Sequence, residues 1–330
     1  MGGDVLLVVV VLVALGFDFT NGFHDTANAV ATSVSTRALT PRQAVAIAAV
    51  ANIAGAFATT AVAKTVGKGL IDSNLATQQT VLAALIGAIA WNLFTWRLGL
   101  PSSSSHALIG GLIGAAIAQS GSKGVLWHGL AHKTAIPSLL SPVIGFGGAF
   151  VVLVIIYWAF SRVPRGPANR TLRLGQLFSG TWFAFSHGAN DAQKTMGVIA
   201  LALFANGSID HIYIPIWVIV AAGMTIAAGT YVGGWRIMRT LGQRIYKMEP
   251  EDGFAAQLSA GTTLYVASSL GFPISTTHVA SGSVMGAGAV RRFSALRWGV
   301  AGNILTAWVL TIPAAGLIAA GLYWPIQAIF

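Results

Sequence analysis

Two short polar stretches inside long apolar segments carry the residues that could do chemistry. Residues 19–29 read FTNGFHDTANA and residues 185–196 read FSHGANDAQKTM, and each contains one aspartate. A carboxylate at the middle of a lipid bilayer costs about 2.5–3.5 kcal/mol on insertion scales, so we expect it to serve a function. Carboxylate and amide oxygens suit Na⁺ or a proton rather than a soft metal. The stretches therefore predict a site for a coupling cation, with the candidate ligands Asp25, Asp191, Asn21 and Asn190.

Two hydroxyl-rich turns follow the aspartates at similar intervals. They read GLPSSSSH at 99–106 and GFPISTTH at 271–278, and each precedes a short apolar segment. A helix N-terminus attracts anions through its free backbone N–H groups and its positive dipole end. A serine or threonine can also simply cap a helix, but a cap uses one residue and not several in succession. The turns therefore predict an oxyanion site, with the candidate residues Ser103, Ser104, Ser105, Ser275, Thr276, Thr277, Asn28, Gln193 and Lys194.

The spacing of these motifs indicates one unit used twice. The two aspartates are 191 − 25 = 166 residues apart, and the histidines that end the two turns are 278 − 106 = 172 residues apart. We expect a first repeat at residues 1–160, a short basic cytoplasmic linker at 161–173 and a second repeat at 174–330. Duplicated halves around a central site are typical of transporters.

Composition places the chain in the membrane. Apolar residues make up 55% of it, charged residues only 8%, and the mean hydropathy is +0.72. A soluble domain usually carries about a quarter charged residues. The chain has no cysteine, which excludes disulfides and thiolate metal sites. The net charge of +10 comes from basic residues in short loops, as membrane topology requires, so we expect no nucleic-acid partner.

The apolar segments predict an all-α integral membrane protein. A full helical span needs roughly 20 residues, and the segments at 106–119 and 279–290 fall short of this length. We therefore predict re-entrant helical hairpins at 80–119 and 254–290. Glycines beside polar residues predict that the first span of each repeat is interrupted. Three spans and one re-entrant hairpin per repeat would make the two repeats inverted relative to each other. The glycines in question are Gly16, Gly22, Gly180 and Gly188.

Loop charges predict the orientation. Basic loops face the cytoplasm, and the layout above places most arginines on one side if both termini lie outside. The outside loops then hold only lysines. Arg97 lies inside an apolar segment, where it either reaches the site or extends to the membrane interface. The inside group includes Arg236, Arg239, Arg244 and Lys247, and the outside group is Lys64, Lys68, Lys123 and Lys133.

The predicted site can bind an anion only if its own negative charge is compensated. An oxyanion beside Asp25 and Asp191 would be repelled, and a low dielectric strengthens the repulsion. Binding becomes favourable only if cations enter or groups are protonated, so we expect symport with Na⁺ or H⁺ and no other cofactor. Lys194 supplies one fixed positive charge, although it could simply pair with Asp191 one helical turn away. Phosphate can donate a hydrogen bond to a carboxylate and sulfate cannot, which favours phosphate and leaves sulfate as the alternative.

A zinc-dependent membrane enzyme is the alternative outside transport. Histidines near acids can bind zinc, and four histidines adjoin the motifs. The chain has no His-Glu-x-x-His pair and no glutamate in an apolar segment. We therefore expect a transporter and not an enzyme. The histidines are His24, His106, His187 and His278.

At these residues the sequence resembles the PiT family of inorganic phosphate transporters. The family's repeated Gly-Ala-Asn-Asp motif is intact at Gly188–Asp191 and becomes Gly-Phe-His-Asp at Gly22–Asp25. The resemblance covers nearly the whole chain, including both Pro-Ser/Thr-His turns. It implies an ion-coupled phosphate importer of the cell membrane. The two motif helices and two hairpins would surround one mid-membrane site with alternating access, in a homodimer.

Overall fold

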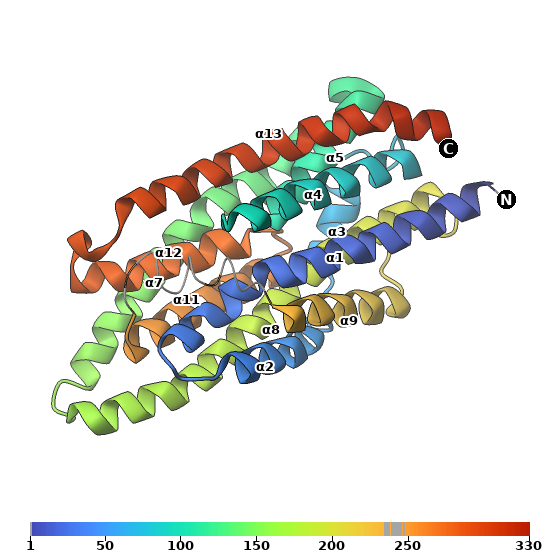
Figure 1. The fold of residues 1–330 in the computed structure, drawn as a ribbon. Coiled ribbons are helices and arrows are strands. Elements are labelled where there is room, and N and C mark those ends of the chain that lie inside the picture. The colour runs from blue at the N-terminus through green and yellow to red at the C-terminus, as the bar shows by residue number, and fades with distance from the viewer. Residues whose placement is uncertain (1, 234–237, 239–245, 247) are drawn as a thin grey trace.

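The apolar segments form helices that pack side by side into an elongated bundle (Figure 1). The computed structural model describes residues 2–233, 238, 246 and 248–330. In this part of the chain the extended structure is one isolated bridge, Ile71 to Val125. The all-α class is therefore confirmed. The main helices are α1 (Gly2–Ser35), α2 (Pro41–Ala56), α3 (Ala61–Lys68), α4 (Gln78–Leu98), α5 (Ser104–Ser120), α7 (Ile136–Ala159), α8 (Arg165–Ala205), α9 (Ile216–Val232), α11 (Pro250–Ser269), α12 (Thr276–Arg291) and α13 (Trp298–Ile329).

Short helical pieces complete the described chain. They are η1 (Gly121–Gly124), α6 (Trp127–Gly129), the π-helical η2 (Leu130–Ala135) and η4 (Phe293–Ala295). Among the described residues, α1, α4, the stretch Trp127–Ala159 and α13 are long and apolar enough to cross a membrane. The pair α2 and α3 passes the same test together, but it is bent by 71°. The chain is a multi-pass membrane protein.

Part of the loop-charge prediction concerns residues that the structure does not describe. Four of the basic residues assigned to the inside loops, Arg236, Arg239, Arg244 and Lys247, lie outside the described residues.

The prediction that the first span of each repeat is interrupted is wrong. Both α1 and α8 are continuous helices, and α8 runs for 41 residues. Their glycines permit close helix packing instead. A Cβ on Gly22 would lie 2.4 Å from the Ile226 carbonyl oxygen of α9, and one on Gly188 would lie 2.2 Å from the Asn52 carbonyl oxygen of α2. The observed break in a span lies between α2 and α3.

The two helical hairpins form where the sequence predicts them, as α4–α5 and α11–α12. Each turn needs a left-handed residue, and glycine supplies it at Gly99 (φ 67°) and Gly271 (φ 75°). The base of α4–α5 lies where α8 ends, because Gln78 donates a hydrogen bond to Asn206. The base of α11–α12 lies at the opposite end of the bundle (Figure 1). The two turns therefore meet in the middle from opposite directions.

Helices from the two halves of the chain pack against each other. α1 packs along α9 and α2 along α8, whereas α5 packs along α13 and α12 along α7. Both termini lie at the same end of the bundle, and the connection between α7 and α8 lies at the other end (Figure 1). Because the packing crosses between halves, neither half buries its own motif alone.

Candidate functional site

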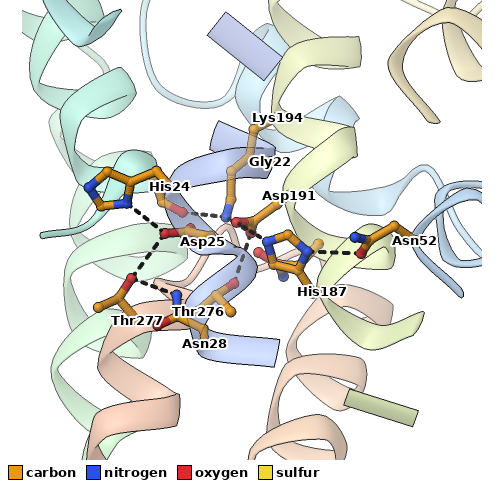
Figure 2. Close-up of polar contacts among 12 residues, drawn as sticks. Gly22, His24, Asp25, Asn28, Asn52, His187, Asp191, Lys194, Thr276 and Thr277 are labelled. Carbon is orange, nitrogen blue, oxygen red and sulfur yellow. Dashed lines mark hydrogen bonds and ion pairs between the residues drawn. The ribbon is translucent and has the colours of Figure 1, made fainter. Parts of the chain in front are cut away.

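Figure 2 shows both aspartates beside Thr276 and Thr277 of the second hydroxyl-rich turn, in one buried cluster. The first turn joins this cluster through Ser105, which contacts Lys194 and the Ile274 carbonyl. Asp25 comes from α1, and His187 and Asp191 come from α8. One ligand atom from each of these three residues lies within 4.8 Å of the others. The side chains of Asp25 and Asp191 are at most 2% exposed. Neither aspartate faces the lipid, and the arrangement can hold a cation between the carboxylates.

Asp25 is held by neutral or titratable neighbours. Its Oδ1 accepts a hydrogen bond from Thr277 Oγ1 at 3.3 Å and lies 3.0 Å from His24 Nδ1. Thr277 in turn accepts one from Asn28 Nδ2 at 2.9 Å. The other ring nitrogen of His24 lies 3.4 Å from Thr95 Oγ1 on α4. The turn of the second hairpin therefore contacts the motif of the first half.

Asp191 is held by a fixed cation. Lys194 forms an ion pair with its Oδ1, Thr276 Oγ1 donates to the same oxygen at 3.1 Å, and His187 Nε2 lies 3.3 Å from Oδ2. Lys194 also donates to Ser105 Oγ at 2.5 Å and to the Ile274 carbonyl at 2.9 Å. The pairing considered as an alternative role for Lys194 exists. The same ammonium group also reaches both hydroxyl-rich turns.

Several buried oxygens at the cluster receive no hydrogen bond from any residue that the structure describes. Leaving such an acceptor unpaired in a dry interior is costly. A cluster of them fits a cation, which interacts with oxygen lone pairs, or a ligand that donates hydrogen bonds. The atoms are Asp18 Oδ2, Asn21 Oδ1, Asn28 Oδ1, Ser104 Oγ and Asn190 Oδ1.

Five of the six predicted hydroxyl residues divide into two groups, and the sixth, Ser104, is the one whose buried Oγ has no partner among the described residues. Ser103 and Ser275 are helix caps, because their Oγ atoms accept from His106 N at 3.1 Å and His278 N at 3.3 Å. The side chains that contact the aspartates, the lysine or the opposite turn belong to the next residues along each helix. These residues are Ser105, Thr276 and Thr277.

The predicted amide residues differ in what they contact. Gln193 Oε1 accepts from Val62 N at 2.9 Å and Ala63 N at 3.2 Å, so it ties α8 to the start of α3. Asn190 Nδ2 donates to Ser268 Oγ at 2.9 Å and to the Phe272 carbonyl at 3.1 Å, at the end of α11. In this conformation the Gln193 amide binds backbone, whereas Asn190 keeps one oxygen for a ligand.

Sequence analysis did not assign two further buried residues at the site. Asn52 on α2 lies with its Oδ1 2.9 Å from His187 Nδ1, and thereby positions the imidazole beside Asp191. Thr195 donates to Asp18 Oδ1 at 2.9 Å. The available signal for Asn52 was one amide side chain inside the apolar segment at 43–63. Thr195 lies inside the polar stretch 185–196, but its contact with Asp18 could not be expected, because the two residues lie on different helices.

The charges at the site do not balance. Among the described residues, Lys194 contributes one fixed positive charge. With Asp18, Asp25 and Asp191 all ionised and the histidines neutral, the formal sum is −3 + 1 = −2, and with Asp18 protonated it is still −2 + 1 = −1. Burying an ion without compensation costs several kcal/mol. Arg97, which the sequence placed inside an apolar segment, is exposed at the end of α4.

Comparisons with known proteins all match this chain to phosphate transporters. A model of the phosphate transporter family matches residues 21–169 and 161–319. A probable low-affinity inorganic phosphate transporter of Rhizobium meliloti is 50% identical over 97% of this chain and 96% of its own. One of Mycobacterium tuberculosis is 49% identical over 96% of this chain and 77% of its own. A solved structure named the sodium-dependent phosphate transporter matches with a TM-score of 0.91 and 26% identity, over 99% of this chain and 100% of that one. These proteins are transporters and not enzymes.

Proposed function

Because the chain belongs to the phosphate transporter family, we propose that it imports inorganic phosphate by symport with Na⁺ or H⁺ at the buried cluster described above. The observation that carries the proposal is the charge balance. An anion enters a site that already has a formal excess of negative charge, so it needs accompanying cations. Na⁺ is favoured over H⁺ by the unpartnered buried oxygens and by the likeness to a transporter named as sodium-dependent.

Phosphate is proposed to bind where the two hairpin turns meet. Its oxygens would accept hydrogen bonds from the hydroxyls and the N-terminal backbone N–H groups of α5 and α12, and a charge-assisted one from Lys194. Ser105 Oγ lies 3.3 Å from the Ile274 carbonyl, so one small anion can contact both turns. The proposed contacts are Ser103, Ser104, Ser105, Ser275, Thr276, Thr277, Asn28, Gln193 and Lys194.

The cations are proposed to bind beside this anion. Asp25 and Asp191 approach closely enough to share one ion with His187. Asn21 and Asn190 each have a buried amide oxygen that accepts no hydrogen bond from the described residues. Such hard oxygen ligands suit Na⁺.

Phosphate is favoured over sulfate by the acceptors in the cluster. Phosphate at neutral pH carries a proton that can be donated to a carboxylate or amide oxygen, and sulfate carries none. Asn28 presents such an oxygen. The site would therefore bind phosphate with a hydrogen bond that sulfate cannot make.

We propose alternating access, which the arrangement of the hairpins supports. The two hairpins enter from opposite ends of the bundle, so residues 1–160 and 174–330 can act as inverted repeats joined by the linker 161–173. Rocking of one repeat against the other would expose the site to each side in turn. We further propose that the protein is a homodimer with both termini outside the cell.

Uptake by the purified protein in vesicles tests the proposal. An inward Na⁺ gradient is expected to drive accumulation of labelled phosphate, and arsenate but not sulfate is expected to compete. Accumulation driven by a proton gradient alone would assign the coupling to H⁺. Undiminished accumulation after both gradients are dissipated would refute coupling.

A further inference from the structure

A basic pocket of about 640 Å³ lies between the end of α3 and the segment 125–133. Lys64 and Lys68 line it from the exposed face of α3, one helical turn apart, and Lys133 lines it from η2. Among the described residues, no acidic side chain forms an ion pair with these three lysines. Like charges one turn apart destabilise a helix, and α3 has only 8 residues. The pocket therefore carries uncompensated positive charge at a cost in stability, which suits a site that binds an anion.

The inner end of the basic pocket lies against the turn of the α11–α12 hairpin. Thr65 lines the pocket, and a Cβ on Gly271 would lie 3.2 Å from the Oγ1 of Thr65. Lys133 Nζ lies 5.4 Å from the centre of the Phe272 ring. The pocket therefore ends in the middle of the bundle, at the turn that carries half of the proposed anion site.

The other end of the basic pocket points to the end of the bundle that holds both termini. A Cβ on Gly67 would lie 3.1 Å from Ile212 Cγ2, in the connection between α8 and α9. Asn206, at the start of this connection, donates a hydrogen bond to Asp4 near the N-terminus. Exposed lysines keep their ammonium groups in water. Under the orientation proposed above, this end lies outside the cell and faces the phosphate to be imported.

The turn that closes the basic pocket also forms a wall of the central cluster. The Phe272 carbonyl accepts a hydrogen bond from Asn190 at 3.1 Å, and the Ile274 carbonyl accepts one from Lys194 at 2.9 Å. Lys194 is only 1% exposed, so the cluster is closed in this conformation. Residues 271–274 therefore separate Lys133 in the pocket from Lys194 in the cluster.

Helix α3 joins the basic pocket to the cluster at a second point. Gln193, the neighbour of Lys194, accepts hydrogen bonds from Val62 N at 2.9 Å and Ala63 N at 3.2 Å at the start of α3. The span formed by α2 and α3 is bent by 71° just before these residues. Irregular backbone at membrane depth is tolerated where protein covers it or where it lines a water-filled cavity. The break therefore fits a passage along α3.

We propose that the basic pocket is an entrance site, where phosphate is held before it passes to the central cluster. This inference rests on the phosphate import proposed above. The lysines raise the local concentration of the anion, as electrostatic steering does. The contacts of Thr65 with Gly271 and of Lys133 with Phe272 close the path, and separation of α3 from residues 271–274 opens it.

Initial rates of phosphate uptake into phosphatidylcholine vesicles at saturating Na⁺ test the entrance site. Replacing Lys64, Lys68 and Lys133 by glutamine is expected to raise the KM for phosphate about tenfold, at the lower end of the range for electrostatic steering. The maximal rate should stay unchanged, because the central cluster is intact. Replacing the same lysines by arginine keeps the charge and should keep the wild-type KM. The control is Lys123→Gln, which changes a basic residue of η1 outside the pocket.

Salt sharpens this test. The Debye length falls from about 30 Å at 0.01 M to about 8 Å at 0.15 M ionic strength. Added choline chloride at constant Na⁺ should therefore raise the KM of the wild type and leave that of the glutamine variant nearly unchanged.

The outcomes separate the entrance site from the proposed function. A wild-type protein that takes up no phosphate would refute the proposed function and the entrance with it. Normal wild-type uptake with an unchanged KM in the glutamine variant, or an equal rise in Lys123→Gln, would overturn the entrance alone. If the glutamine variant kept its KM and lost phosphatidylglycerol in native mass spectrometry, the pocket would belong to a lipid headgroup, which also overturns the entrance.

Cysteine labelling in intact cells tests the side and the occupant of the basic pocket. The chain has no cysteine, so Lys68→Cys introduces a single thiol. A negatively charged, membrane-impermeant methanethiosulfonate added outside should react with it and raise the KM, a positively charged one should restore the KM, and phosphate should slow both reactions. In the control Lys123→Cys, phosphate should leave the reaction rate unchanged. Reaction from the inside only, or no protection by phosphate, would overturn the proposal.

Discussion

Asp25 and Asp191 occupy matching positions in the two halves of the chain, yet the charges around them differ. Three residues after Asp191 stands Lys194, and three residues after Asp25 stands Asn28. Each of these two side chains hydrogen-bonds the turn of the opposite half. Asn28 donates to Thr277 and Lys194 donates to Ser105, and these partners are also matched, since 194 − 28 = 166 and 277 − 105 = 172.

The different charges around the two aspartates indicate that Asp25 and Asp191 have different roles, although their positions in the two halves match. Asp191 already has a fixed cation within hydrogen-bonding reach. Asp25 has His24 and Thr277 instead, neither of which carries a fixed charge. We infer that the fixed charge on α8 serves the anion, and that the coupling cation compensates chiefly Asp25.

The same contrast recurs at the bases of the two hairpins. At the base of α4–α5, Thr80 donates a hydrogen bond to Gln119. At the matching positions of α11–α12, Arg291 Nε donates to Asp252 Oδ1 at 3.1 Å. The offsets are 252 − 80 = 172 and 291 − 119 = 172. One base is neutral and the other is ionic, so the two ends of the bundle should respond differently to solution conditions.

The largest effect is expected from Lys194→Asn. This substitution gives the second half of the chain the residue type that the first half has at the matching position, Asn28. Removing one partner of a buried ion pair typically costs about 3–5 kcal/mol, or about 10²- to 4 × 10³-fold in an equilibrium. Phosphate uptake into vesicles should fall by that order. The combined variant Asn28→Lys with Lys194→Asn moves the charge to the other half. Wild-type uptake by Lys194→Asn alone would contradict the assignment of the fixed charge to the anion.

Neutralising Asp25 and neutralising Asp191 should have different effects on the Na⁺ dependence of phosphate uptake. We expect Asp25→Asn to abolish the Na⁺ dependence of uptake and to lower concentrative uptake at least about tenfold. Asp191→Asn should instead leave Lys194 without its acidic partner and weaken uptake while Na⁺ dependence is retained. The measurement is the initial rate of uptake against Na⁺ concentration. Identical Na⁺ profiles for the two variants would refute the division of tasks.

Substitution of two matched glycines is expected to have a smaller effect than the changes above. The loss of stability should be of similar size at both positions. In Gly22→Ala and Gly188→Ala the new Cβ would lie within 2.4 Å of a backbone oxygen on the neighbouring helix. Overpacking of this kind typically costs about 1–3 kcal/mol, so both variants should lower the Tm in detergent. The control is Gly16→Ala, where no heavy atom lies within 4 Å and helix propensity favours alanine. A normal Tm for either variant would show that the bundle can widen there.

The smallest effect is expected from pH at the ionic hairpin base. The hydrogen bond from Arg291 lowers the pKa of Glu249, just ahead of α11, below its usual value of about 4.5. A carboxyl with a lowered pKa stabilises the folded state above its unfolded pKa, and this contribution is lost as pH falls through the folded value. Burial raises the pKa of Asp252 at the same base to about 6, so this carboxyl makes the opposite contribution as pH falls from 6 to about 3.8. Hydrogen exchange, corrected for its intrinsic pH dependence, should therefore speed up at the ends of α11 and α12 only below about pH 3.8. The base of α4–α5 serves as the internal control, and equal changes at both bases would contradict the contrast.

Local sequence patterns were sufficient for the two helical hairpins and for the pairs of motifs. The short segments after Ser103 and Ser275 indicated re-entrant hairpins, because their length is below that of a span. The interruption of α1 and α8 was predicted wrongly, because glycine next to polar residues has the same pattern in a broken helix and in a closely packed one. Only the position of the Ile226 and Asn52 carbonyls distinguishes the two cases.

The sequence by itself determined that acids, hydroxyls and one lysine lie inside a membrane, since composition and spacing are properties of the chain alone. The tertiary structure decided which of them meet. Gln193 binds the start of α3, Asn52 holds His187, and Lys194 reaches Ser105 from the other half. These contacts join residues separated by 89 to 135 positions. No local pattern encodes such pairings, because they depend on helix packing between the two halves.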